Sequence, residues 1–268
     1  MGEEHRIVIP GIQERIPDVC DFVVVAARRA NLNERAVYHC QMAVDEACTN
    51  VIEHGYGGNN TDGHIEIICR DTAATFAITI IDDSPPFNPL LREDPDPDEP
   101  LADREPGGWG IYFIKKMMDE VDYLYEGERN QLTIRKLKSP VTLVQPTGDS
   151  AVKGVAVREL QNGIWEVTPT ERLESNTAPE LQSILDMQLA AGNRHLIVNM
   201  HRTTFISTSG LKVLVSTWRT AQKADGDIVL AEMQPQVREV FDTVGFDQIF
   251  AIYPTVDKAL VDMLNQTA

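Results

Sequence analysis

Three side chains that can handle protons or metal ions recur at helical spacing in the segment Val44–Tyr56, VDEACTNVIEHGY. Glu46, Asn50 and His54 stand four residues apart, which places them on one stripe of a helix. The carboxylate of Glu46 could act as a general base, and the amide oxygen of Asn50 could bind a hard cation such as Mg²⁺. The alternative is an ordinary solvated helix face. Two motifs further along the chain bear on which of the two interpretations applies.

A second polar group follows a stretch that alternates like a β-strand. The segment Ile80–Pro89, IIDDSPPFNP, continues into acidic residues, a small residue and two prolines. Asp82 could accept a hydrogen bond from an exocyclic amine such as that of adenine. The alternative is an acidic turn, which is common on its own.

Glycines precede an apolar helix in the segment Gly107–Tyr123, GGWGIYFIKKMMDEVDY. Glycines at a helix N-terminus let backbone N–H groups approach a phosphate closely. Gly108 and Gly110 are therefore candidate phosphate-binding residues, although a lone GGxG pattern carries little weight. No P-loop pattern, GxxxxGK[ST], occurs anywhere in the chain.

Three consecutive hydroxyls stand before a helix in the second half, in the segment Phe205–Leu211, FISTSGL. One of Ser207, Thr208 and Ser209 could simply cap a helix that begins near Leu211. The functional alternative is a phosphoacceptor at a helix N-terminus, where free N–H groups tolerate a phosphate. Phosphorylation would add about −1.5 to −2 charges there, which is enough to repel an acidic partner.

The first half must supply the elements that position these residues. An acidic, proline-rich segment, 91–107, interrupts it as a mobile lid or a disordered loop. Turn residues at 55–63 precede a pair of strands whose alternation predicts antiparallel neighbours. Periodicity predicts a strand, two helices and four further strands in turn: Arg6–Ile9, Ile12–Ala30, Glu34 to about His54, His64–Arg70, Phe76–Ile81, Tyr123–Tyr125 and Gln131–Lys136.

The second half alternates strands and helices, which predicts a small βα domain with a mostly parallel or mixed sheet. The apolar run His195–Met200 is typical of a strand covered on both faces. We expect Asn176 or Ser175 to cap the helix that follows the first two strands. The other expected strands are Ala156–Leu160, Ile164–Pro169, Asp227–Ala231 and Ile249–Tyr253, and the expected helices are Asn176–Ala191, Gln234–Val244 and Thr255–Leu264.

Composition limits the classes of function. The 268 residues are enough for two ordinary domains, and the formal charge of −17 argues against binding to nucleic acid or to an anionic membrane surface. No apolar run approaches the about 18 residues of a membrane span, and the start MGEEHRIVIP has no secretory signal, so we expect a cytoplasmic protein. The cysteines form no metal-like spacing and are expected to be reduced core thiols: Cys20, Cys40, Cys48 and Cys69.

Taken together and in order, the first three motifs resemble those of the anti-sigma-factor serine kinases, members of the histidine-kinase-like ATPase superfamily. The motifs are EAxTNxxxHGY, then IxDx followed by a small residue and PPF, then GGxG before a helix that ends in MDEV. The resemblance covers about residues 5–138. It implies an α/β sandwich with a mixed or antiparallel sheet, helices on one face, and bound ATP and Mg²⁺. It also implies a homodimer through this domain.

The same resemblance assigns roles to single residues. It implies that Glu46 is the base that activates the acceptor hydroxyl and that Asn50 is the Mg²⁺ ligand. It places Asp82 on the adenine amine. Gly108 and Gly110 would lie beneath the phosphates, and His54 would have a structural role.

One departure from the kinase pattern concerns nucleotide binding. The family usually has glycine where Ser84 stands, and a position that needs a positive φ would disfavour serine. Ser84 therefore belongs to the nucleotide-binding set, as a residue that could alter adenine affinity or the path of the loop.

The second half resembles the STAS domain of anti-sigma-factor antagonists over about residues 154–266. The motifs are HLIVNM, FISTSGLKVL and QPxVxxVFxxxGF. Thr208 matches the phosphoacceptor of that family, normally a serine, and Ser207 matches a position that aspartate often occupies. Ser209 is the fallback acceptor. We therefore predict an ATPase domain at 1–138, a linker at 139–153 and a STAS domain at 154–268.

The combination implies a bacterial partner-switching regulator: an ATP-dependent serine/threonine kinase and anti-sigma factor fused to its STAS substrate. The kinase would phosphorylate Thr208 or another STAS protein, and its partners would be a sigma factor or a STAS antagonist. The alternative is a scaffold, catalytically weak or inactive, that binds nucleotide and sequesters such a partner. A sensor histidine kinase is disfavoured because no dimerisation helices with a phosphoacceptor histidine precede the motifs.

Overall fold

A computed structural model describes residues 4–96, 108–138, 154–161 and 163–267. The chain forms two compact units, and the predicted linker 139–153 lies outside the described residues. No helix in the described ranges is both long and apolar enough to cross a membrane. The mixed α/β class predicted for both halves is confirmed.

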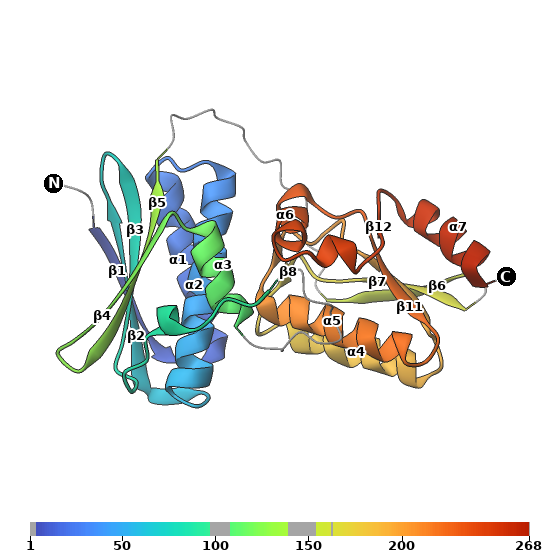
Figure 1. Ribbon diagram of the computed structural model, residues 1–268, viewed down its shortest axis with the longest axis horizontal. Helices are drawn as coiled ribbons and strands as arrows, with labels where there is room; N and C mark the ends of the chain where they lie inside the picture. The colour runs from blue at the N-terminus through green and yellow to red at the C-terminus, as the bar shows by residue number, and fades with distance from the viewer. Residues whose placement is uncertain (1–3, 97–107, 139–153, 162, 268) are drawn as a thin grey trace. The chain divides into compact units, whose positions relative to one another are not determined.

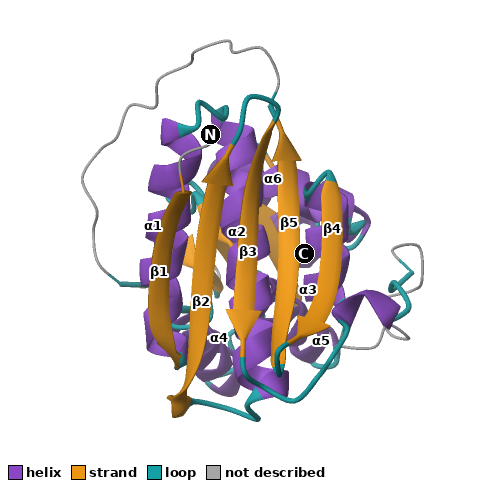
Figure 2. Ribbon diagram, turned by 90° about the vertical axis from the view of Figure 1, so that its left-hand side faces the viewer, coloured by secondary structure: helices purple, strands orange, loops and turns teal. Residues whose placement is uncertain are grey.

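The first unit is a five-stranded antiparallel sheet in the order β1-β2-β3-β5-β4. Three helices, α1, α2 and α3, cover one face of this sheet. Figure 2 is viewed onto the opposite face, so the helices lie behind the strands. The elements in chain order are β1 (Glu4–Gly11), α1 (Ile16–Arg29), α2 (Glu34–Asn50), β2 (Asn60–Asp71), β3 (Thr75–Asp82), α3 (Trp109–Met117), β4 (Glu120–Glu126) and β5 (Arg129–Leu137).

Alternation along β3 explains how the sheet delivers a polar group to the site. Phe76, Ile78 and Ile80 are buried against the helices, and Asp82 follows them with the same period of two. In the neighbouring strand β5, Leu132 continues the same layer. The last residue of β3 therefore carries its carboxylate into the space between the sheet and α2.

The predicted helix through Val44–Tyr56 is wrong in its last turn. The α-helix α2 ends at Asn50, and Val51–Gly55 forms a single π-helical turn. The backbone N–H of Tyr56 bonds the carbonyl of Val51 at 2.8 Å, which is the i to i+5 pattern of a π-turn. The wider turn breaks the expected stripe, so His54 lies exposed whereas Glu46 is buried.

The second unit contains a mixed sheet in the order β12-β11-β9-β7-β6, with only the β6–β7 pair antiparallel. Figure 1 shows α4 and α5 on one side of this sheet and α7 on the other. The elements are β6 (Ala156–Gln161), β7 (Ile164–Thr168), β8 (Arg172–Leu173), α4 (Ala178–Ala190), β9 (His195–Asn199), β10 (Phe205–Ile206), α5 (Thr208–Gln222), β11 (Asp227–Ala231), α6 (Pro235–Thr243), β12 (Ile252–Tyr253) and α7 (Val256–Thr267).

The central strand β9 is covered on both faces, as its apolar sequence predicts, because Leu196, Ile197 and Val198 are all fully buried. The predicted cap of α4 is wrong. Thr177, not Asn176 or Ser175, is the N-cap residue, and its hydroxyl bonds the carbonyl of Arg172 instead of capping the helix.

Candidate functional site

A pocket of about 450 Å³, including its open mouth, lies between the sheet and α2 of the first unit. Its polar lining comes from separate parts of the sequence: Asn50 in α2, Asp82 at the end of β3, Ser84 in the following loop and Asn130 in β5. Its apolar lining residues are Ala47, Val51, Ile80, Phe87, Pro89, Ile111, Tyr123 and Leu132. A mostly apolar wall with a few convergent polar groups is typical of a site for a small organic ligand.

Asp82 and Asn130 are opposite each other in the β3–β5 ladder and hydrogen-bond through their side chains. The Asn130 amide nitrogen donates to Asp82 Oδ1 at 2.9 Å, and both residues are buried. Asn130 was not among the residues predicted from the sequence. The available signal was its alternation with Leu132 and Ile134, which identifies position 130 as helix-facing.

Ser84 adopts an ordinary backbone conformation. Among described residues other than glycine, a positive φ occurs only at Asn31, Glu128, Asp225 and Glu232. Serine is therefore not strained at this position, which removes the conformational reason to expect weaker nucleotide binding. Its backbone N–H and its hydroxyl both donate to Asp82 Oδ1.

A second group of predicted residues lies where α3 packs against α2. A Cβ added to Gly110 would lie 2.6 Å from Glu46 Oε2 and 3.5 Å from Asn50 Nδ2. Within the described ranges, Asn50 Nδ2 is buried and has no hydrogen-bond partner. The carboxylate, the amide and the glycine of three predicted positions therefore form one cluster, with a polar atom left for a ligand.

Gly108 is the N-cap residue of α3 and has a left-handed backbone, at a φ of +94°. A Cβ at this position would lie 3.3 Å from Nε of Arg92, so an exposed guanidinium lies beside the start of the helix. Arg92 is not among the residues predicted from the sequence. It adds a positive charge where the glycines were predicted to approach phosphate.

Tyr56 fastens the π-turn to the sheet. Its hydroxyl lies within hydrogen-bond distance of Asp83 Oδ1 and of the His64 carbonyl oxygen. Its ring covers Gly11 and Gly63, where an added Cβ would lie 2.6 Å and 2.7 Å from ring atoms. Burial and the Asp83 carboxylate raise the pKa of Tyr56, and the same hydrogen bond lowers the pKa of Asp83.

The second unit carries the predicted hydroxyl cluster at the start of α5. The helix begins at Thr208 rather than near Leu211, and Ser207 is its N-cap residue. The prediction that a hydroxyl caps the helix is not met by Ser207, whose buried Oγ has no partner in the part of the chain that the structure describes. Ser209 Oγ is engaged with Ser175 Oγ at 3.2 Å.

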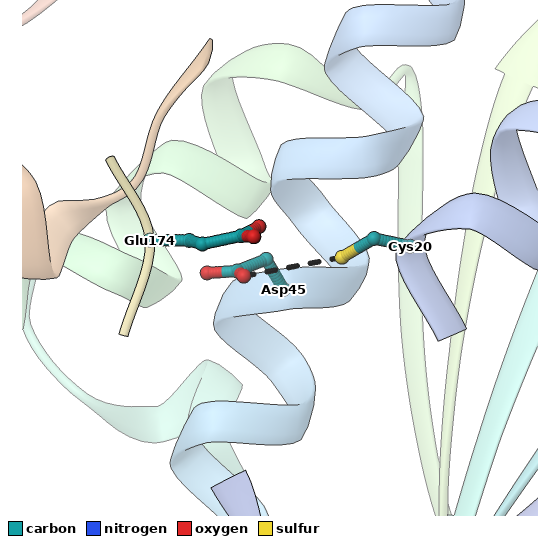
Figure 3. Close-up of side chains that lie close together, drawn as sticks. All are labelled: Cys20, Asp45 and Glu174. Atoms are coloured by element: carbon teal, nitrogen blue, oxygen red, sulfur yellow. Dashed lines mark hydrogen bonds between the residues drawn. The ribbon is translucent and has the colours of Figure 1, made fainter. Parts of the chain in front are cut away.

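The cysteines are buried free thiols, as predicted. Burial raises the pKa of Cys40 and of Cys69 to about 12, so neither is a reactive thiolate at neutral pH. Cys20 Sγ lies 3.9 Å from Asp45 Oδ1 (Figure 3), a weak bond inside the helical layer. The third residue labelled in Figure 3, Glu174, belongs to the second unit and pairs there with Arg172 at 2.9 Å.

Comparison with known proteins assigns each half to a domain type. The family described as the histidine kinase-like ATPase domain matches residues 9–136, and the STAS domain family matches residues 156–259. BtrV of Bordetella bronchiseptica, named as an anti-sigma factor antagonist, is 34% identical over 80 residues, which are 30% of this chain and 69% of BtrV. The serine-protein kinase RsbW of Oceanobacillus iheyensis is 27% identical over 128 residues, which cover 41% of this chain and 76% of RsbW.

A solved structure is also similar to part of the chain. The crystal structure of an anti-sigma factor antagonist from Mycobacterium paratuberculosis is 26% identical, covers 40% of this chain and 91% of its own, and has a TM-score of 0.37.

Proposed function

We propose a function on the premise that the chain belongs to two families, the histidine kinase-like ATPases through residues 9–136 and the STAS-domain proteins through residues 156–259. Its relatives include serine-protein kinases and anti-sigma factor antagonists. The chain is a partner-switching regulator in which the ATPase domain phosphorylates a serine or threonine of a STAS domain, its own or that of another protein. The phosphate then changes which partner the STAS domain binds.

The observation that carries this proposal is that one pocket is lined by polar groups of two separate motifs, Asn50 of the first and Asp82 of the second, and that Gly110 of the third motif lies beside Asn50. Asp82 accepts from the adenine amine, while Gly108 and Gly110 accommodate the phosphates at the start of α3. Two features favour an anionic ligand there: the unpartnered amide nitrogen of Asn50, which can donate a hydrogen bond, and the guanidinium of Arg92 beside Gly108. Asn50 would hold Mg²⁺, which supplies charge neutralisation on the phosphates.

Glu46 acts as the general base in this mechanism. Its carboxylate takes the proton of the acceptor hydroxyl as that oxygen bonds to the γ-phosphorus of ATP, and the bond to the bridging oxygen breaks to release ADP. Catalysis in this class rests mainly on positioning and electrostatic stabilisation. The close approach of Gly110 to Glu46 Oε2 supports the role, because it holds the carboxylate beside the predicted phosphate site.

Thr208 is the proposed acceptor within this chain. It is the first residue of α5, where free backbone N–H groups favour a phosphate. Ser207 and Thr208 are both buried, and Ser209 is engaged with Ser175. Thr208 is chosen among the three because it matches the phosphoacceptor position of the STAS family. The partners proposed for the regulator are a sigma factor or a STAS antagonist, and the ATPase domain is proposed to form a homodimer.

The test is intact-mass spectrometry of the purified chain before and after incubation with ATP and Mg²⁺, with peptide mapping of residues 203–222. We expect one added phosphate on Thr208, its loss in Thr208→Val, and loss of at least about 100-fold in rate in Glu46→Gln. Glu126→Gln, at an exposed position of β4, is the matched control and should behave like the wild type. Full labelling of Glu46→Gln would contradict the role of Glu46.

If ATP binds but no phosphate is transferred to the chain or to an added STAS protein, the scaffold alternative replaces the kinase. A nucleotide-binding measurement on the same sample separates these results, because a scaffold still binds ATP. A chain that binds no nucleotide would contradict the proposal as a whole.

A further inference from the structure

Asn130 has its amide orientation fixed by its neighbours. Its oxygen Oδ1 accepts from the Tyr123 hydroxyl at 2.6 Å and from the Phe87 backbone N–H at 3.2 Å. Because the Phe87 backbone N–H can only donate, the atom it contacts must be the amide oxygen, and the nitrogen Nδ2 must face the other way. There it donates to Asp82 Oδ1 at 2.9 Å and to the Ser84 carbonyl at 3.0 Å.

Because of these contacts, the two carboxylate oxygens of Asp82 have different surroundings. Oδ1 accepts from the Asn130 amide, the Ser84 backbone N–H and the Ser84 hydroxyl. Oδ2 has no hydrogen-bond partner in the described part of the chain, and Asp82 lines the pocket. One oxygen is therefore held by the protein, and the other is left to accept from a ligand.

Ser84 acts on the same oxygen. Its hydroxyl donates its only hydrogen to Asp82 Oδ1 and lies 3.2 Å from Asn130 Nδ2, from which it can accept. The hydroxyl is thus fully used inside the protein and offers no donor to the pocket. The atom left for a ligand at this edge of the pocket is Asp82 Oδ2, a hydrogen-bond acceptor. It therefore favours a ligand that presents a hydrogen-bond donor there.

We propose that Asn130 is a positioning residue for nucleotide recognition, which holds the Asp82 carboxylate so that Oδ2 accepts from the exocyclic 6-amino group of the purine. Ser84 is the second positioning residue in this arrangement. The proposal rests on the nucleotide-binding function proposed above. It extends that function to a residue of β5 that acts on the ligand through its hydrogen bond to the Asp82 carboxylate.

A purely structural role would have a different signature. Asn130 also ties the loop at Phe87 to Tyr123 of β4, so its loss could loosen the pocket for every nucleotide equally. A residue that acts through the contact between Asp82 and the amine matters only when the ligand carries that amine. The comparison of two ligands therefore separates the two roles.

The experiment measures dissociation constants of the full chain for ATP and for purine riboside 5′-triphosphate, which lacks the 6-amino group. We expect Asn130→Ala to raise the dissociation constant for ATP about tenfold and that for the amine-free nucleotide less than about twofold. Ser84→Ala should show the same selectivity with a smaller loss. Thermal melting of each variant reports folding, and Ser84→Ala decides the question if Asn130→Ala does not fold.

Equal weakening of both nucleotides by the folded variants would overturn the proposal, as would a wild type that binds the two nucleotides equally well. Both of those results would leave nucleotide binding itself intact. A wild type that binds neither nucleotide would instead overturn the proposed function, and this inference with it.

Discussion

Gly110 shows how a single missing side chain shapes the proposed catalytic group. It lies in the first turn of α3, where its lack of a Cβ lets the helix approach Glu46 Oε2. An added Cβ would lie 2.6 Å from that oxygen, a distance that real Cβ atoms do not occupy. The atom that must move is the end of a flexible side chain, so the fold can accommodate the change by displacing the carboxylate.

Gly110→Ala should therefore separate stability from activity. Alanine is favoured over glycine inside a helix by about 1 kcal/mol, so the melting temperature should stay level or rise slightly. Phosphotransfer should fall by at least about tenfold, because a shifted Glu46 no longer faces the acceptor hydroxyl. Rate measurements and thermal melts on the same preparation test both halves, and an unchanged rate would show that the position of Glu46 does not matter.

The π-turn Val51–Gly55 follows α2, and the Tyr56 hydroxyl bonds it to the sheet. The pKa of Asp83 is lowered in the folded chain, chiefly by the hydrogen bond from Tyr56. A lowered folded-state pKa contributes stability above the unfolded value of about 3.9, and that contribution is lost as the pH falls through the folded value. The contribution is modest because Asp83 is exposed to solvent.

Tyr56→Phe keeps the ring over Gly11 and Gly63 and removes only the hydroxyl. We expect the free energy of unfolding to drop by about 1 kcal/mol at neutral pH, with a smaller difference from the wild type in acid, well below the unfolded pKa of about 3.9. Urea denaturation at the two pH values measures this. A difference that stays constant between them would mean that the hydrogen bond to Asp83 contributes nothing.

Periodicity in the sequence predicts most of the elements because burial has a period in both helices and strands. The alternation of Phe76, Ile78 and Ile80 predicts β3 and leads to Asp82 at its end. The π-turn could not be predicted, since its wider hydrogen bonding leaves the composition of an ordinary helix end unchanged. His54 was therefore placed on a stripe that does not exist.

The candidate site was predicted from sequence motifs, and the site residues that were not predicted lie outside those motifs. Arg92 stands in a segment chosen only for its acidic character, and Asn130 looks like an ordinary turn residue at the start of a strand. Their neighbours are set by the pairing of β3 with β5 and by the position of α3, which are contacts between distant parts of the sequence. Ser84 was predicted as a departure, but its hydrogen bonds to Asp82 required the folded loop.

At the scale of the whole molecule, the chain joins a proposed kinase to a proposed substrate through residues 139–153. Tethering two domains in one chain raises the effective concentration of one domain near the other. Labelling of Thr208 should then be intramolecular, with a half-time that does not change on tenfold dilution. Transfer between separate chains would lengthen the half-time about tenfold under the same dilution.

A mixture of two variants separates transfer within a chain from transfer inside a dimer, which dilution alone does not. Glu46→Gln keeps the acceptor and lacks the base, whereas Thr208→Val keeps the base and lacks the acceptor. Since each variant lacks what the other has, a phosphorylated peptide from residues 203–222 of the mixture can come only from transfer between chains. We expect the mixture to stay unlabelled while the wild type is labelled in parallel, because the tether favours each chain's own acceptor, and labelling of the Glu46→Gln chain would instead assign the transfer to a dimer partner.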